Sequence, residues 1–216
     1  ADIGVGEDYR NENSMITKII HEDKIQKAHK YIEKGESFVI VTHVSPDGDA
    51  IGSALGLFHF LNAYGKENVS VIVPNDYPNF LKWIPGNKDV TIYEKYPEFS
   101  EQLISDADVI FCLDFNDPKR IEKLADPVLK SEARKVLIDH HLHPVEFCNV
   151  TMSYPNISST SEMVFRFICR MGLFDLIDKN AAECIYTGMM TDTGAFTYNS
   201  NHPEIYTIIG ELIKLG

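Results

Sequence analysis

Cysteine is scarce in this sequence, and none of it is paired. The four cysteines stand at positions 112, 148, 169 and 184, so no two have the C-x-x-C spacing of a zinc knuckle. Isolated thiols in apolar surroundings, such as Cys112 in VIFCL, are typical of proteins in a reducing compartment. The sequence therefore predicts a cytoplasmic protein without a cysteine-bound zinc ion.

Long hydrophobic runs are also missing. No segment approaches the roughly 18 apolar residues that a transmembrane helix needs. Residues 1–14 are polar and acidic and lack the apolar core of a signal peptide. We expect this segment to be either an added leader or a disordered native terminus. The sequence thus predicts neither secretion nor a membrane partner.

Positive charge is in short supply. The chain has 20 lysines and arginines against 32 acidic residues, a net charge of −12. Proteins that grip long nucleic acid through its phosphates normally carry a basic face, so we expect no long duplex among the partners. A small phosphorylated substrate remains compatible with this charge, because bound metal ions reverse the local field.

A dinucleotide-binding fingerprint is absent as well. The glycines at 48, 52 and 56 are spaced by four, which differs from the G-x-G-x-x-G pattern. We interpret them as small residues that let a helix pack closely on a strand.

Strand and helix patterns alternate along the 216 residues. Apolar, β-branched runs predict buried strands at 38–42, 69–73, 109–113 and 135–138. Periodic apolar positions predict helices at 21–35, 51–64, 99–107 and 120–133, followed by 158–171, 181–190 and 203–215. The alternation predicts an α/β fold, a mostly parallel sheet with helices on both faces and a helix-rich C-terminal part. We treat residues 15–216 as one domain.

Acidic and imidazole side chains gather where the predicted strands end. His43, Asp47 and Asp49 follow the first strand, Asp114 follows the third, and Asp139-His140-His141 follow the fourth. A later helix runs into Thr191-Asp192-Thr193-Gly194. Ligands of parallel α/β sheets bind beyond the carboxyl ends of the strands. Carboxylates and imidazoles without thiolates suit Mn²⁺, Mg²⁺, Fe²⁺ or Co²⁺.

Each motif alone also has a structural interpretation. His43 alone fits a hydrogen-bonded histidine, Asp47-Gly48-Asp49 a turn and helix cap, and Thr191 to Gly194 a helix stop. Their conjunction in one domain is what indicates a metal site.

The four ordered motifs resemble those of the DHH phosphoesterase superfamily. They are His43-x-x-Pro46-Asp47-x-Asp49-Ala50-x-Gly52-Ser53, then Asp114, then Asp139-His140-His141, then Asp192. The contexts Asp114-Phe115-Asn116 and Thr191 to Phe196 look most like the nanoRNase and pAp-phosphatase branch. The resemblance spans residues 38 to about 200 and implies the DHH-type, Rossmann-like catalytic domain.

The resemblance implies two divalent metal ions, with manganese as the first expectation and magnesium or cobalt as alternatives. His43 and Asp47 would hold one ion, Asp49, His140 and Asp192 the other, and Asp114 would bridge them. His141 is expected near the scissile phosphate as a catalytic residue, or else as an orienting group. Asp139 is expected to hold an imidazole in one tautomer.

Several residues are weaker candidates for substrate binding. Asn116 and Arg120 follow the bridging Asp114 and could reach a phosphate, or they could belong to a solvated first helical turn. The cluster Ser158, Ser159 and Thr160 resembles a family motif, and it also fits a helix N-cap.

The implied function is that of a metal-dependent phosphohydrolase. A hydroxide formed on the two metals would cleave phosphoesters of short oligoribonucleotides, of 3′-phosphoadenosine 5′-phosphate, or of both. Alternatives in the superfamily are a dinucleotide or cyclic-dinucleotide phosphodiesterase, a pyrophosphatase and an exopolyphosphatase. A different class would be a metal-dependent nucleotide-binding module without turnover.

Two further expectations concern organisation. No Gly-Gly-Gly-His motif occurs, so we expect the family's C-terminal substrate-binding domain to be absent from this chain. The sequence leaves open whether the chain is a truncated or a natural single-domain form. A homodimer is one expected assembly.

Overall fold

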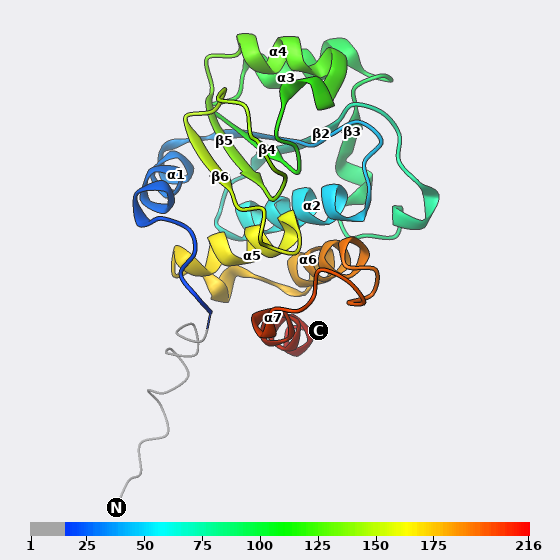
Figure 1. Cartoon of the computed structure of the whole chain (residues 1–216). Helices are drawn as coiled ribbons and strands as arrows, with labels where there is room; N and C mark the ends of the chain where they lie inside the picture. The colour runs from blue at the N-terminus through cyan, green and yellow to red at the C-terminus, as the bar shows by residue number, and fades with distance from the viewer. Residues whose placement is uncertain (1–15) are drawn as a thin grey trace, which may run out of the picture.

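Six parallel strands form a single sheet in the order β3-β2-β1-β4-β5-β6 (Figure 1). The structure is a computed structural model that describes residues 16–216, so the leader or tail predicted over residues 1–14 lies outside the described residues. The strands are β1 (Ser37–Val41), β2 (Asn68–Val73), β3 (Val90–Ile92), β4 (Val109–Leu113), β5 (Arg134–Asp139) and β6 (Val150–Ser153). The predicted parallel sheet is confirmed.

Helices cover both faces of the sheet, as predicted (Figure 1). On one face, side chains such as Ile40 and Phe111 pack against α1, α2, α5, α6 and α7. On the other, Val39 and Ile110 pack against α3, α4 and the 3₁₀ segment η4 (Pro118–Leu124). Neighbouring residues of a strand point to opposite faces, so the continuous apolar runs fill both cores. The helices are α1 (Glu22–Lys34), α2 (Gly48–Ala63), α3 (Pro97–Ser105), α4 (Ala125–Lys130), α5 (Thr160–Arg170), α6 (Lys179–Asp192) and α7 (Pro203–Lys214).

Four short 3₁₀ turns complete the elements: η2 (Asn79–Leu81), η3 (Asn87–Asp89), η4 (Pro118–Leu124) and η5 (Phe174–Leu176). After β6 the described chain contains helices alone, which confirms the predicted helix-rich C-terminal part. The single helix predicted at 120–133 is wrong, because Glu122, with a φ of 48°, interrupts the helical geometry inside η4, and α4 ends at Lys130. The strands β3 and β6 were not predicted.

The glycines of α2 face another helix, which corrects the prediction that they pack on a strand. A Cβ atom on Gly52 would lie 2.6 Å from the carbonyl oxygen of Cys184 and 2.8 Å from the backbone nitrogen of Gly188, both in α6. A Cβ on Gly56 would lie 2.7 Å from Ile185 of the same helix. Because these glycines have no side chain, the backbones of α2 and α6 can come into direct contact. This contact brings the start of α2 beside the end of α6.

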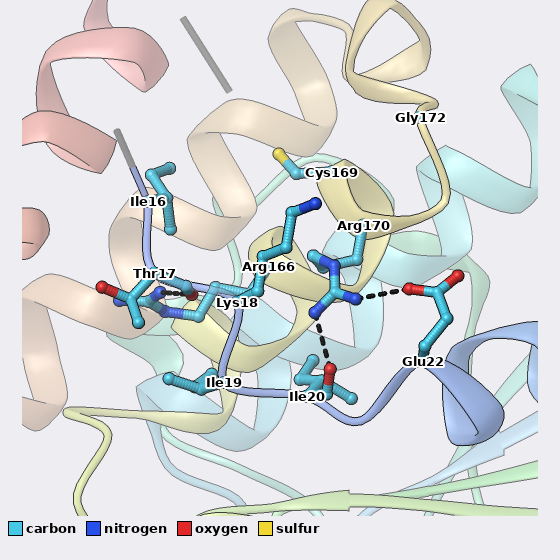
Figure 2. A pocket seen from close by; sticks show the side chains of 10 residues that line it. All are labelled: Ile16, Thr17, Lys18, Ile19, Ile20, Glu22, Arg166, Cys169, Arg170 and Gly172. Atoms are coloured by element: carbon cyan, nitrogen blue, oxygen red, sulfur yellow. Dashed lines mark hydrogen bonds and ion pairs between the residues drawn. The ribbon is translucent and has the colours of Figure 1, made fainter. Parts of the chain in front are cut away.

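Two arginines of α5 bind the segment that precedes α1 (Figure 2). Arg170 donates to the carbonyl oxygen of Ile20 at 2.6 Å and pairs with Glu22. Arg166 is buried, donates to the carbonyl oxygen of Thr17, and pairs with Glu162 and with Glu204 of α7. These contacts tie residues 17–22, α5 and α7 into one unit.

Candidate metal centre

The central strands β1, β4 and β5 are neighbours in the sheet, and their carboxyl ends carry the predicted ligands. His43 follows β1 by two residues, Asp114 directly follows β4, and His140 directly follows β5. The strand order reverses between β1 and β4, which is the position where parallel α/β sheets open a crevice for ligands. The helices α2 and α6 complete the cluster, because α2 carries Asp49 and α6 ends on Asp192.

One imidazole lies between two carboxylates. The Nε2 atom of His43 is 3.2 Å from Oδ2 of Asp114 and 3.8 Å from Oδ2 of Asp47. Its Nδ1 lies 2.8 Å from the carbonyl oxygen of Val44 and donates to it when the ring is neutral. That bond leaves the Nε2 lone pair toward the carboxylates, as a metal-ligating histidine requires.

A second imidazole lies among three carboxylates. The Nε2 atom of His140 is 3.5 Å from Asp192, 3.6 Å from Asp114 and 3.7 Å from Asp49. Its Nδ1 lies 3.3 Å from the carbonyl oxygen of Ile157, which orients this ring in the same way. These contacts define two clusters of ligand-type atoms, one around His43 and one around His140.

Asp114 belongs to both clusters. Its Oδ2 faces His43 and its Oδ1 faces His140, so its carboxylate lies between the two rings. The residue has a φ of 64°, a left-handed conformation that costs free energy in a non-glycine residue. The hydroxyl of Thr160 donates to Oδ1 at 2.9 Å and fixes the carboxylate in this position.

Asp47, the N-cap of α2, and Asp49, in its first turn, accept hydrogen bonds from backbone N–H groups. Asp47 caps the helix, since its Oδ1 accepts from Asp49 at 3.0 Å and from Ala50 at 2.9 Å, while Oδ2 faces His43. Asp49 is buried, and its oxygens accept from the backbone N–H groups of Thr160 at 2.7 Å and Ser161 at 2.8 Å. These bonds fix both side chains before any ion binds.

The electrostatics of the cluster favour divalent cations. Burial, followed by the charges of Asp114 and Asp192, raises the pKa of Asp49 well above its ordinary range. Burial and the charge of Asp47 do the same to the pKa of Asp114. Within residues 16–216, no lysine or arginine forms an ion pair with the four clustered carboxylates. Oxygen and imidazole donors without a compensating cation fit Mn²⁺, Mg²⁺ or Co²⁺.

His141 points to Asp139 and is half-buried. Its Nδ1 lies 2.7 Å from Oδ1 of Asp139, and its backbone N–H donates to Oδ2 of the same residue at 3.0 Å. The hydrogen bond to Asp139 raises the pKa of His141 above its ordinary value. The carboxylate therefore accepts a hydrogen bond from Nδ1–H, which keeps this proton on Nδ1 and leaves Nε2 unengaged by Asp139. Ring atoms of His141 also come within 4.8 Å of ligand atoms of Asp114 and His140.

The weaker candidates fall into two groups. Asn116 and Arg120 lie beside the centre: Asn116 donates to the carbonyl oxygen of Leu142 at 2.5 Å, and Arg120 donates to that of Asp114 at 3.4 Å. Ser158, Ser159 and Thr160 are all buried, and the hydroxyl of each forms a hydrogen bond within the protein. Ser159 caps α5, Ser158 binds Glu162, and Thr160 binds Asp114. Their placement indicates support of the centre.

Asn75 is a residue that sequence reasoning missed. It follows β2, and its Oδ1 accepts the backbone N–H of Ser45 at 2.7 Å. Ser45 has a φ of 53° and lies in the loop between His43 and Asp47, so Asn75 holds this loop in shape. The sequence signal for it is its position two residues after the end of β2, since polar residues after strand ends gather at this edge of the sheet.

Comparisons with known proteins agree with these motifs. Residues 37–189 match the family model described as the DHH family, N-terminal domain. The chain is 35% identical over 177 residues to the bifunctional oligoribonuclease and PAP phosphatase NrnA of Thermus thermophilus, covering 82% of this chain and 49% of that protein. It is 27% identical over 182 residues to the protein of the same name from Bacillus subtilis, covering 83% of this chain and 53% of that one.

A solved structure is also similar. The crystal structure of an exopolyphosphatase-related protein from Bacteroides fragilis superposes with a TM-score of 0.92 at 59% identity, covering 93% of this chain and 59% of that one. The chain spans about half the length of the curated relatives named above. The predicted resemblance to the nanoRNase and pAp-phosphatase branch is confirmed at the level of similarity. With its matched segment covering residues 37–189, the chain belongs to the DHH family.

Proposed function

We propose that this chain hydrolyses phosphoesters of short oligoribonucleotides and of 3′-phosphoadenosine 5′-phosphate with two divalent metal ions. The observation that carries the proposal is the position of Asp114 between the clusters around His43 and His140. His43 and Asp47 would hold one ion, Asp49, His140 and Asp192 the other, and Asp114 both. Four carboxylates carry a charge of about −4, which two divalent ions balance.

Two bound divalent ions would lower the pKa of a water molecule and would neutralise charge on the phosphoryl oxygens. The residues of the chain have complementary tasks. His141 donates a proton from Nε2 toward the leaving oxygen, because Asp139 holds its Nδ1 proton and favours its charged form. Arg120, which forms no ion pair among the described residues, offers a guanidinium to a substrate phosphate beside the centre.

The finer assignments belong to the same proposal. Manganese is our first choice of metal because the donors are carboxylates and imidazoles. A cytoplasmic location is supported by four free thiols. No helix within residues 16–216 combines the length and apolar character that crossing a bilayer requires. Gel filtration with light scattering tests the proposed homodimer.

A substrate panel tests the proposed activity. The chain, loaded with Mn²⁺, is incubated with 3′-phosphoadenosine 5′-phosphate, di- to pentaribonucleotides, cyclic dinucleotides, pyrophosphate and polyphosphate. Release of mononucleotide or adenosine 5′-phosphate supports the proposal. Preference for cyclic dinucleotides, pyrophosphate or polyphosphate would assign one of the alternative activities, and binding without turnover in a single-turnover assay would assign a binding module.

A further inference from the structure

The segment that follows β4 contacts the loops of both neighbouring strands. Asn116 donates from Nδ2 to the carbonyl oxygen of Leu142 at 2.5 Å, and its own carbonyl oxygen accepts the N–H of Val145 at 2.8 Å. On the other side, the carbonyl oxygen of Arg120 accepts the N–H of Val44 at 2.8 Å. The first two contacts reach the loop between β5 and β6, and the third reaches the loop between β1 and α2. The segment after β4 therefore joins the two loops that carry the proposed imidazole ligands.

The loop between β5 and β6 carries His141 on an anchored backbone. The N–H of His141 donates to Asp139 at 3.0 Å, and its carbonyl oxygen accepts the hydroxyl of Ser153 at 3.2 Å. Asp139 ends β5 and Ser153 ends β6, so these two bonds come from the strands that the loop connects. The next carbonyl group, that of Leu142, is held by Asn116. The contacts of Asn116 therefore tie the loop to the carboxyl end of β4, where the proposed metal bridge lies.

The turn between the two contacts of Asn116 is strained. His143 lies between Leu142 and Val145 and has a φ of 59°, a left-handed conformation that costs free energy in a non-glycine residue. Residues 142–146 are all exposed, so burial of their side chains contributes little to their conformation. The hydrogen bonds of Asn116 on either side of His143 therefore offset this cost and hold the loop in one conformation.

We infer that Asn116 is a positioning residue, which places His141 for proton donation to the leaving oxygen by holding the loop that carries it. The inference rests on the proposed function, and it gives Asn116 a task other than the substrate contact expected from the sequence. A displacement of a reacting group by about 1 Å can cost up to about 100-fold in rate. The side chain of Asn116 binds the residue after His141, so its loss should lower kcat and leave the binding of substrate and metal nearly unchanged.

Two esters with different leaving groups test this role. A ribose oxygen leaves as a strong base and needs a proton, whereas nitrophenolate is a weak base and leaves without one. For Asn116→Ala loaded with Mn²⁺, kcat should fall about 10-fold with a diribonucleotide and less than about twofold with bis(p-nitrophenyl) phosphate. The KM for the dinucleotide and the Mn²⁺ content should stay within about twofold of wild type.

Asn149→Ala is the matched control. Asn149 also lies between β5 and β6, and its Oδ1 accepts the N–H of Lys135 at 2.8 Å, at the opposite end of β5 from His141. This variant should keep the wild-type kcat with both esters. Three results for Asn116→Ala would each overturn the inference: unchanged kinetics with the dinucleotide, a higher KM at unchanged kcat, or an equal loss of kcat with both esters. The second would make Asn116 a substrate contact, and the third would show a general disturbance of the centre.

A measurement without substrate tests the loop itself. The heteronuclear ¹H–¹⁵N NOE of the His143 amide reports picosecond-to-nanosecond motion. It is measured on the full chain with Mg²⁺, because Mn²⁺ is paramagnetic. The NOE should fall in Asn116→Ala and keep its wild-type value in Asn149→Ala, and an unchanged NOE in Asn116→Ala would overturn the inference. If wild type cleaves neither ester, the proposed function fails, while the NOE still decides whether Asn116 holds the loop.

Discussion

Asp49 and Thr160 are 111 positions apart in the sequence, yet the Asp49 carboxylate accepts the backbone N–H of Thr160 at 2.7 Å. The same carboxylate accepts from Ser161, so it closes the first turn of α5 while facing His140. An anion at a helix N-terminus is stabilised by the free N–H groups and by the helix dipole. The start of α5 and the proposed metal centre therefore share one carboxylate.

The first prediction separates a bridging ligand from a ligand of one site. Asp114→Ala should abolish turnover and weaken both metal sites, because this carboxylate faces both imidazoles. Asp192→Ala should mainly empty one site, since the ion pair of Asp192 within residues 16–216 is with His140. The measurement is the Mn²⁺ content of each variant by elemental analysis and by titration calorimetry. Full occupancy of two sites in Asp114→Ala would refute its bridging role.

The second prediction concerns the pair of His141 and Asp139. His141→Ala should keep its metal content and lose about 10²–10⁴-fold in kcat, as expected when a proton donor is removed. Asp139→Asn should lose about 10–100-fold, because the amide holds the Nδ1 proton of His141 less well. Metal content and kcat are measured on the same samples. Loss of metal from His141→Ala would make His141 a ligand instead.

The third prediction tests the close approach of α2 and α6. Gly52→Ala should destabilise the protein by about 1–3 kcal/mol, because the new Cβ would lie 2.6 Å from the carbonyl oxygen of Cys184. Gly210→Ala is the matched control in α7, where a Cβ meets nothing within 4 Å. This control should be stabilised by up to about 1 kcal/mol. Urea unfolding of both variants measures the difference, and equal stability of the two would contradict helix contact at Gly52.

The fourth prediction concerns pH. Partial burial alone would raise the pKa of Glu204, but hydrogen bonds from Thr17 and Arg166 outweigh it and hold the pKa below its ordinary value of 4.5. A carboxyl with a lowered pKa in the folded state stabilises the protein fully above its unfolded pKa, and this contribution disappears as pH falls through the folded pKa. Glu204→Gln should therefore cost about 1–2 kcal/mol at pH 7 and progressively less below pH 4.5.

Glu211→Gln serves as the control for this pH series. Glu211 lies on the same helix, and its contact with the exposed Lys214 is a surface pair, which contributes little. The free energy of unfolding is followed from pH 7 to pH 3 for wild type and both variants. A constant difference between wild type and Glu204→Gln across this range would rule out ionisation of Glu204 as its source.

The features that could be predicted from the sequence are those with a local sequence pattern. Buried strands such as 109–113 are continuous apolar runs, so the strands and the residues that follow them could be placed before the structure was known. The weak elements escaped because their signal is weak: β3 has three residues, and β6, VTMS, is half-exposed and polar at two positions. The break at Glu122 escaped because a left-handed φ at a glutamate has no sequence signature.

The sequence predicted where the helices, strands and site residues lie better than it predicted which residues contact each other. The spacing of Gly52 and Gly56 indicates a close contact but does not name the partner, and the partner proved to be a helix. Thr160 was singled out as a substrate contact, whereas its hydroxyl donates to Asp114 from across the fold. Asn75 was overlooked because its effect passes through the backbone of Ser45. Such long-range pairings depend on the sheet order, which periodicity cannot supply.

The proposed metal ligands are spread along the sequence from His43 to Asp192, and this spread would decide when a metal can bind. During synthesis the first imidazole emerges long before the last carboxylate. His43 and Asp114 are brought together by the pairing of β1 with β4, and Asp114 and His140 by the pairing of β4 with β5. The complete set of proposed ligands exists only in the folded chain, so ions bound there would add their binding free energy to the native state. At a free metal concentration of 100 times the dissociation constant, one such ion shifts the equilibrium by about 2.7 kcal/mol toward the native chain. Metal supply in the cell would thus set how long this protein survives proteolysis, independently of its turnover.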